Sequence, residues 1–272
     1  MAILNTTTAT SGTYALWHEL RADQLRALAS AATLILPVAA TEQHGPHLAT
    51  GTDTFIADAI LERVRKTPPG AGTFVQLPTQ SVGASDHHTD FGGTLSLPSS
   101  MFAALLVAQL RCLVGQGHRR ILVFNSHGGN IAPIKVALAD LAADLHGAGA
   151  LVAAVSYWEL AASAWNEIEE VRGRALAHAC EFETSIIYAA RPDLPKITPP
   201  ARHDYDDPVG LRCELALPFS ASTNHGAFGN PAAASAALGN RLLDSAAHAL
   251  RKFLQDFANY HLQKPGGPRG AG

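Results

Sequence analysis

Short runs of consecutive apolar residues alternate along this chain with longer segments of helical periodicity. The expected strands are residues 34–38, 73–77, 121–124 and 150–155, and most of their residues are apolar. The expected helices are residues 55–64, 101–114, 131–145, 183–190 and 231–260. Strands that are apolar on both faces are typical of parallel sheets covered by helices on both sides. The alternation therefore predicts an α/β fold with a mainly parallel sheet.

The 272 residues, of which 47% are hydrophobic, are enough for one α/β domain with a large core. We expect a single domain over residues 1–263. The segment 196–218, rich in Pro, Asp and Arg, is expected to be a long excursion, and the tail 264–272 to be disordered. Asn130 is a predicted N-cap of its helix, and Pro231 is expected to open the last one.

Charge and composition exclude several classes of protein. The net charge is −3 and no basic run is present, so we expect no nucleic-acid partner. No apolar stretch reaches the ~18 residues of a membrane span, and the N-terminus lacks the pattern of a signal peptide. Three irregularly spaced cysteines form no disulfide framework, which favours a reducing, cytoplasmic location. The chain also holds thirteen histidines, several of them clustered.

Imidazoles and carboxylates gather directly after the expected strands. Such segments are residues 41–47 (TEQHGPH) with 51–53 (GTD), 125–130 (NSHGGN) and 156–159 (SYWE), and a fourth, 178–185 (HACEFETS), opens a later helix. Loops at the carboxyl ends of parallel strands meet at one edge of the sheet and form the active site. Mixed His and Asp/Glu ligands suit zinc, manganese or iron, and this set is large enough for two ions.

Each segment also has an interpretation without chemistry. Glu42 could cap a turn, and Asp53 could be the N-cap of the helix that follows it. Residues 125–130 could be a glycine-rich anion nest, as in a non-catalytic protein that binds a phosphate. Glu181 and Glu183 could complement a helix dipole. Their joint occurrence on strand-end loops favours a metal site.

These motifs resemble those of the creatininase family. The resemblance rests on residues 41–53, 125–130 and 178–185, with a weaker match at 92–97 (GGTLSL), and its order and spacing extend from about residue 15 to about residue 260. It implies a three-layer α/β/α sandwich, a centre of two divalent ions (zinc, manganese or iron) in each chain, and a homo-oligomer, in this family a hexamer.

The resemblance also implies roles for individual residues. It places Glu42 and His127 on one ion, His44 on the other, and Asp53 as the bridge between them. Creatinine-hydrolysing members carry a carboxylate where this chain has Gly129. The expected substitute is Glu181, with Glu183 as a supporting residue or the alternative ligand.

Metal chemistry then suggests the reaction. A water that bridges two cations becomes hydroxide near neutral pH and attacks an amide-type carbonyl. An acid must protonate the leaving nitrogen, and the resemblance implies His178 for this role, because it matches the family's catalytic histidine. Trp158 is a candidate wall for a planar substrate, and His88, one of the adjacent pair 87–88, is a candidate substrate contact. Arg174 stands where creatinine hydrolysers have a Trp, which favours an anionic or polar substrate other than creatinine.

The sequence thus predicts a metal-dependent amidohydrolase that cleaves an amide, lactam or formamide bond, outside ordinary peptide bonds, in a small polar substrate. Two alternatives stay open at this point. One is a peptidase of the same family that acts on a short precursor peptide, and the other is the non-catalytic small-molecule binding protein.

Overall fold

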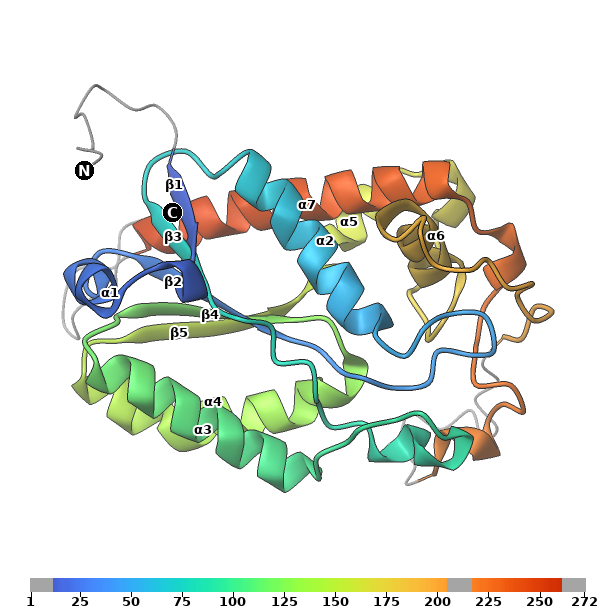
Figure 1. Cartoon of the computed structure of the whole chain (residues 1–272), viewed down its shortest axis with the longest axis horizontal. Coiled ribbons are helices and arrows are strands. Elements are labelled where there is room, and N and C mark those ends of the chain that lie inside the picture. The colour runs from blue at the N-terminus through green and yellow to red at the C-terminus, as the bar shows by residue number, and fades with distance from the viewer. Residues whose placement is uncertain (1–11, 205–216, 261–272) are drawn as a thin grey trace, which may run out of the picture.

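Five parallel strands form the single sheet of the computed structural model, which describes residues 12–204 and 217–260. Their spatial order is β1 (Thr13–Leu16), β3 (Thr73–Gln76), β2 (Thr33–Val38), β4 (Arg120–Asn125) and β5 (Leu151–Ser156). Every neighbouring pair is parallel, so the predicted sheet is confirmed (Figure 1). The four expected strands are all present, and the short edge strand β1 is an addition.

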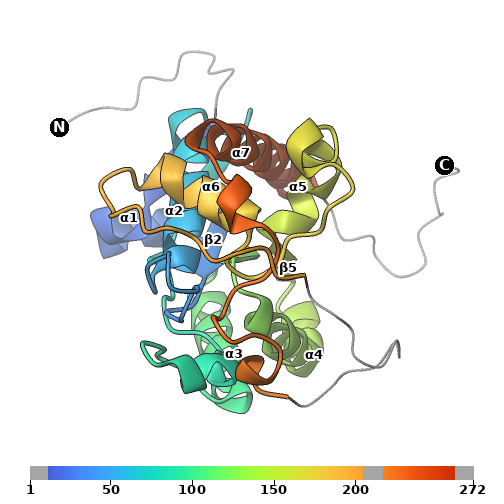
Figure 2. The same cartoon turned by 90° about the vertical axis from the view of Figure 1, so that its right-hand side faces the viewer.

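Helices cover both faces of the sheet and make three layers (Figures 1 and 2). One face carries α3 (Ser99–Gly115) and α4 (Ile131–Gly147). The other carries α2 (Thr52–Lys66), α5 (Tyr157–Trp165), α6 (Glu181–Ala190) and α7 (Ala236–Asn259), while the short α1 (Ala22–Leu28) precedes β2. This arrangement confirms the expected α/β/α sandwich.

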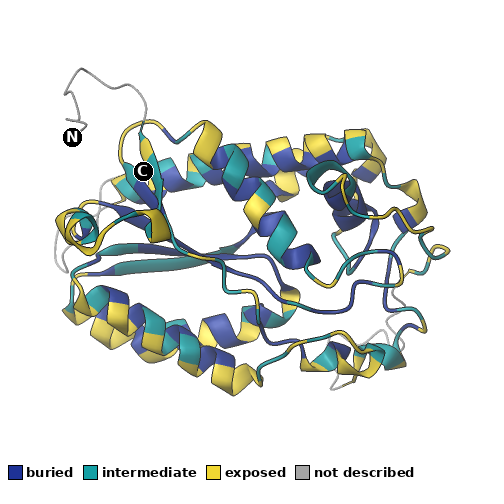
Figure 3. Cartoon of the chain, viewed as in Figure 1, coloured by how far each residue is buried: buried dark blue, intermediate teal, exposed yellow. Residues whose placement is uncertain are grey.

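Alternate residues of the central strands pack into two separate hydrophobic cores, one on each face of the sheet. Ile35 of β2 and Leu122 of β4 pack under the layer that contains α2 and α7, whereas Leu34 and Val123 pack under α3 and α4. Successive side chains of a strand point to opposite faces, so a strand buried on both sides must be apolar throughout. All six residues of β2 and five of the six of β4 are buried, the class coloured dark blue in Figure 3.

One helix cap and two helix starts differ from the predicted ones, while α4 starts at Ile131 as expected. The side chain of Asn130 makes no cap and instead accepts the Ala84 N–H and donates to the Ala39 carbonyl, which joins two strand-end loops. Pro231 opens only a short 3₁₀ turn, and α7 begins after Ser235, whose hydroxyl accepts a backbone N–H. Residues 156–159, expected as a loop, are a capping box that starts α5.

Part of the remaining expectations lies outside the described residues. The tail 264–272 and residues 205–216 of the expected excursion are not described. Residues 196–204 of the excursion are described, and they contain no helix or strand apart from an isolated bridge between His203 and Gly229. Within the described ranges, no helix combines the length and the apolarity that a membrane crossing requires.

All carboxyl ends of the strands point to the same edge of the sheet, because every strand is parallel. The segments that leave this edge run toward the right of Figure 1, the side that faces the viewer in Figure 2. The loops after β2, β3 and β4 therefore come together with the first turns of α2 and α6.

Candidate metal centre

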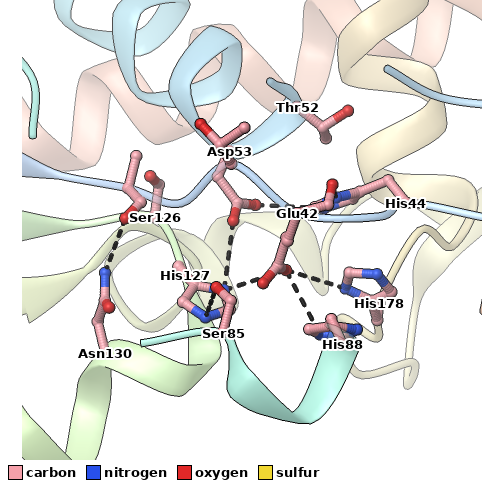
Figure 4. A network of polar contacts seen from close by, with 12 residues as sticks. Glu42, His44, Thr52, Asp53, Ser85, His88, Ser126, His127, Asn130 and His178 are labelled. Atoms are coloured by element: carbon pink, nitrogen blue, oxygen red, sulfur yellow. Dashed lines mark hydrogen bonds and ion pairs between the residues drawn. The ribbon is translucent and has the colours of Figure 1, made fainter. Parts of the chain in front are cut away.

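His127, Glu42 and Asp53 meet at the centre of this edge although they come from three elements (Figure 4). Glu42 follows β2, Asp53 lies in the first turn of α2, and His127 follows β4. The Nδ1 atom of His127 lies 3.2 Å from Glu42 Oε1 and 3.3 Å from Asp53 Oδ2. Its Nε2 contacts the carbonyl of Ala84 at 3.1 Å and donates to it, so in the neutral ring the Nδ1 lone pair faces both carboxylates.

His44 approaches the other side of Asp53. Its Nε2 lies 3.2 Å from Asp53 Oδ1 and 3.7 Å from Glu183 Oε2, while its Nδ1 donates to the backbone carbonyl of Glu42 at 3.2 Å. Asp53 thus turns one oxygen toward His44 and the other toward His127. That is the arrangement expected of a carboxylate shared by two cations.

The donor atoms of this cluster fit metal ions. Both carboxylate oxygens of Glu42, Nε2 of His44 and Oδ2 of Asp53 are buried and have no hydrogen-bond partner among the described residues. Buried acceptors without a partner are costly unless a proton or a cation satisfies them. Within the part of the chain that is described, three groups have ligand atoms within 4.8 Å of one another: Glu42 with His87 and His127, Glu42 with His44 and His178, and His44 with Asp53 and Glu183.

The electrostatics of the cluster also favour cations. Burial alone would lower the pKa of His44, but the carboxylates of Asp53, Glu183 and Glu42 outweigh it and raise this pKa to about 9. Glu42 and Asp53 likewise outweigh burial and raise the pKa of His127 well above its ordinary value. Burial raises the pKa of Glu183 to about 7. The carboxylates therefore hold protons on the same atoms that would bind metal.

His88 supports Glu42 through a fixed tautomer. Gln43 Oε1 accepts the Gly45 N–H, so the amide nitrogen of Gln43 faces His88 and donates to its Nδ1 at 2.8 Å. The proton of neutral His88 is consequently on Nε2, which lies 3.5 Å from Glu42 Oε1. Burial lowers the pKa of His88 to about 2, so the neutral form persists.

His178 presents a lone pair to the same carboxylate. Its Nε2 donates to the Gln43 carbonyl at 2.7 Å, and this contact fixes the proton because the Gln43 amide nitrogen, 3.1 Å away, is also a donor. The opposite atom, Nδ1, lies 3.6 Å from Glu42 Oε1. Burial, followed by the charges of His44 and His88, lowers the pKa of His178 well below its ordinary value. The ring is therefore neutral, and the lone pair on Nδ1 faces Glu42.

A cavity of about 270 Å³ opens beside these groups. Of the residues named from sequence, those that line it are Glu42, Asp53, His88, His127, Trp158, His178 and the alternative ligand Glu183. His44 lies beneath this lining, fully buried. Trp158 and Phe219 supply apolar wall, and the Phe219 ring lies 4.4 Å from His88 and 5.0 Å from His178 between centroids.

Glu181 and Arg174, the expected second-ion ligand and substrate contact, lie apart from this cluster. The Glu181 carboxylate binds Arg174 Nη1 at 2.6 Å and accepts the Asn230 N–H at 2.7 Å, and both side chains line a neighbouring cavity. Glu183 is the carboxylate that reaches His44, and it is held there by the Ala179 N–H at 2.6 Å. Arg174 therefore contacts Glu181 instead of the cavity beside His178. Cys180 is buried, and burial raises the pKa of its thiol to about 12.

The sequence carried unequal signals for the remaining residues of the site. Glu183 was named as the alternative ligand, because it is in the same motif as Glu181. His87 had a weaker signal, as the neighbour of His88. Gln43 was inside the first motif, but only the folded geometry reveals its contacts with two histidines. Phe219 comes from the end of the Pro-rich excursion and carried no local signal.

The family model described as creatinine amidohydrolase matches residues 18–254. The chain belongs to the creatininase family. Among curated family relatives, a mycofactocin precursor peptide peptidase from Mycobacterium ulcerans is 32% identical over 167 residues, which span 60% of this chain and 60% of the relative. A creatinine amidohydrolase from Pseudomonas putida is 30% identical over 190 residues, or 65% of this chain and 70% of the relative.

A solved structure of creatininase in a manganese form shares the fold. It aligns with a TM-score of 0.69 at 22% identity and covers 89% of this chain and 97% of its own. The creatininase resemblance stated from the motifs is therefore confirmed at the level of family and fold. The chain spans about three fifths of the length of the peptidase that it matches.

Proposed function

We propose that this chain is a hydrolase of the creatininase family that binds two divalent ions and cleaves an amide-type carbon–nitrogen bond in a small polar substrate. Glu42 and His127 would hold one ion, His44 and Glu183 the other, and Asp53 would contribute an oxygen to each. One observation carries the proposal: both carboxylate oxygens of Glu42, Nε2 of His44 and Oδ2 of Asp53 are buried without a hydrogen-bond partner among the described residues, beside a cavity that His178 lines.

When bound, two divalent ions would acidify a water molecule and polarise the substrate carbonyl. The protein side chains position the ions and transfer protons. His178 accepts a proton at Nδ1, because its other nitrogen is already committed to the Gln43 carbonyl. The same atom can then return the proton to the leaving nitrogen, so His178 serves first as base and then as acid. The Gln43 carbonyl stabilises the charged ring between these steps.

The cavity supports a small substrate with an apolar part. Its volume of about 270 Å³ suits a short segment or a small ring, and the side chains of Trp158, Leu176 and Phe219 provide apolar contact. Gly129, where creatinine-hydrolysing members have a carboxylate, argues against creatinine itself. We infer that the substrate is another amide, lactam or formamide.

A peptide substrate is the second candidate. The relative from Mycobacterium ulcerans is named a precursor peptide peptidase and is 32% identical to this chain, which supports a peptide-type amide as a candidate substrate. The Ala177 backbone is shared by the cavity of His178 and by the neighbouring cavity of Glu181 and Arg174. A substrate longer than one residue would therefore have room beyond the cleaved bond.

The test is a hydrolysis assay with protein stripped of metal and reloaded with zinc, manganese or iron. The panel contains creatinine, other lactams, formamides and short peptides. We expect amine release from a member other than creatinine, lost with a chelator and restored by metal. His178→Ala should lose this activity while it retains the metal. Hydrolysis that survives both the chelator and His178→Ala would contradict the proposal, as would wild-type protein that takes up no metal.

A further inference from the structure

We propose that His87 is an additional protein ligand of the ion assigned to Glu42 and His127, an inference that rests on the metal centre proposed above. His87 lies in the 3₁₀ turn Asp86–Phe91 between β3 and α3, which no expected ligand occupies. Its ligand atom lies within 4.8 Å of those of Glu42 and His127. Its ring is nearly parallel to that of His127, with 13° between the planes and 5.8 Å between the centroids.

The hydrogen bonds of the histidines distinguish His87 from its neighbours. His44, His88, His127 and His178 each have at least one ring nitrogen held by a backbone or side-chain partner. Among the residues that the structure describes, neither ring nitrogen of His87 has a hydrogen-bond partner. The ring is half-buried and lines the cavity of the metal cluster. His87 can therefore direct a lone pair at an ion without breaking an existing contact.

His88 cannot take this role without losing its fixed tautomer. Its Nδ1 accepts from Gln43, and its Nε2 carries the proton that faces Glu42. A nitrogen needs a free lone pair to bind a metal. Of the two adjacent histidines, only His87 has an uncommitted lone pair on this side of the cluster.

Gly129 provides the space that His87 fills. A Cβ atom at position 129 would lie 2.8 Å from His87 Cε1, 2.5 Å from His127 Nε2 and 2.2 Å from the Ala84 carbonyl oxygen. The imidazole of His87 therefore reaches the centre only because position 129 has no side chain. A carboxylate at 129, as in creatinine-hydrolysing members, and an imidazole at 87 would exclude each other. This chain has Gly at position 129 and His at position 87.

The consequence is an unequal pair of sites. The ion of Glu42 and His127 would have two nitrogens and two oxygens, with His87 and Asp53 included. The ion of His44 would have one nitrogen and two oxygens, from Asp53 and Glu183. Imidazole-rich sets favour zinc and cobalt, whereas carboxylate-rich sets accept manganese readily. We therefore expect the first site to bind Co²⁺ or Zn²⁺ ahead of the second.

The experiment titrates metal-stripped full-length protein with Co²⁺ and follows the visible absorption of the bound ion. Wild type is compared with His87→Ala, His87→Gln and Asp86→Ala, the last being an exposed residue of the same turn. Each is also made in a Glu183→Gln background, in which the ion of Glu42 and His127 is the one retained. The readouts are the stoichiometry, the two Kd values and the absorption spectrum.

We expect both His87 variants to raise one Kd by about tenfold or more and to change the spectrum of that ion, in either background. Asp86→Ala should match wild type. Unchanged Kd values and spectra in a folded His87 variant would overturn the role of His87 and leave the proposed hydrolase intact. Loss of cobalt binding by the wild type itself would instead contradict the metal centre, so the two failures are distinguishable.

Discussion

Gly129→Ala, compared with Gly128→Ala, isolates the packing of the strand-end loop against the metal cluster. At position 129 a Cβ would lie 2.2 Å from the backbone oxygen of Ala84, more than an ångström inside ordinary van der Waals contact, which begins at 3.4 Å. At position 128 a Cβ would meet nothing within 4 Å. The two substitutions add the same methyl group to adjacent residues of one turn, so their difference measures the close approach alone.

The magnitude follows from two effects at position 129. Overpacking of a tight interior site costs about 1–3 kcal/mol. The added methyl would also separate the Ala84 carbonyl from His127 Nε2, now 3.1 Å apart, and a lost hydrogen bond costs about 0.5–1.5 kcal/mol. We expect Gly129→Ala to lower the free energy of unfolding by about 2–4 kcal/mol, and Gly128→Ala to change it by less than about 0.5 kcal/mol.

Gly129→Ala should also bind metal more weakly than Gly128→Ala. The Ala84 carbonyl fixes the tautomer of His127, and loss of such a partner typically weakens metal binding by about 10–100-fold. The assays are urea unfolding of the metal-free proteins and competition for zinc with a chelating dye. Equal stability and equal zinc affinity of the two variants would refute the argument that this loop is packed against the cluster.

Three further predictions concern the ligands and the proton carrier. Glu183→Gln should abolish tight binding of one of the two ions. Glu181→Gln should retain both ions and lower the free energy of unfolding, because it removes the partner of Arg174. Equal loss of metal in the two variants would contradict this assignment. Metal-free protein should lose stability as the pH rises. The folded pKa values of His44 (about 9, against 6.5) and Glu183 (about 7, against 4.5) are both raised. The contribution of each group to the free energy of unfolding is therefore full at low pH and is lost as the pH rises through its folded pKa. Urea midpoints between pH 6 and pH 9.5 measure this effect, saturating zinc should oppose it, and a midpoint that rises with pH in metal-free protein would disprove it. His178→Ala should lower kcat by about 10²–10⁴-fold with unchanged metal content, and a variant that keeps wild-type kcat would remove His178 from the proton path.

The sequence predicts well which residues gather at the carboxyl edge of the sheet, because these residues lie next to the strands along the chain. Glu42, Asp53 and His127 each come directly after an apolar strand or open the next helix, and parallel strands must bring such residues to one edge. The capping box at residues 156–159 was also readable, and its Ser and Glu three residues apart could have identified the start of α5.

The choice between Glu181 and Glu183 could not be made in the same way. Both lie in the first turn of α6, and residues two apart on a helix point to nearly opposite sides. Which side faces the centre depends on the rotation of the helix, and that is set by its packing against α2 and α7. The positive φ of Ala179, 53°, then places the backbone N–H that holds Glu183.

Phe219 and His87 illustrate a second limit. Phe219 is far from the motifs in sequence and reaches the cavity only because its segment folds back against the turn Asp86–Phe91. The role of His87 depends on free space at Gly129, which follows β4. Neither relation has a local pattern, since each joins segments that are distant along the chain.

The metal content of purified protein tests the central claim most directly. Elemental analysis would compare wild type with Asp53→Ala and with Asp58→Ala, which removes an exposed carboxylate from the same helix. The account predicts about two equivalents of zinc, manganese or iron per chain in wild type and in Asp58→Ala, and a collapse of this content in Asp53→Ala. Wild-type protein that stays free of metal after zinc and manganese are supplied, or Asp53→Ala that still holds two equivalents, would contradict it.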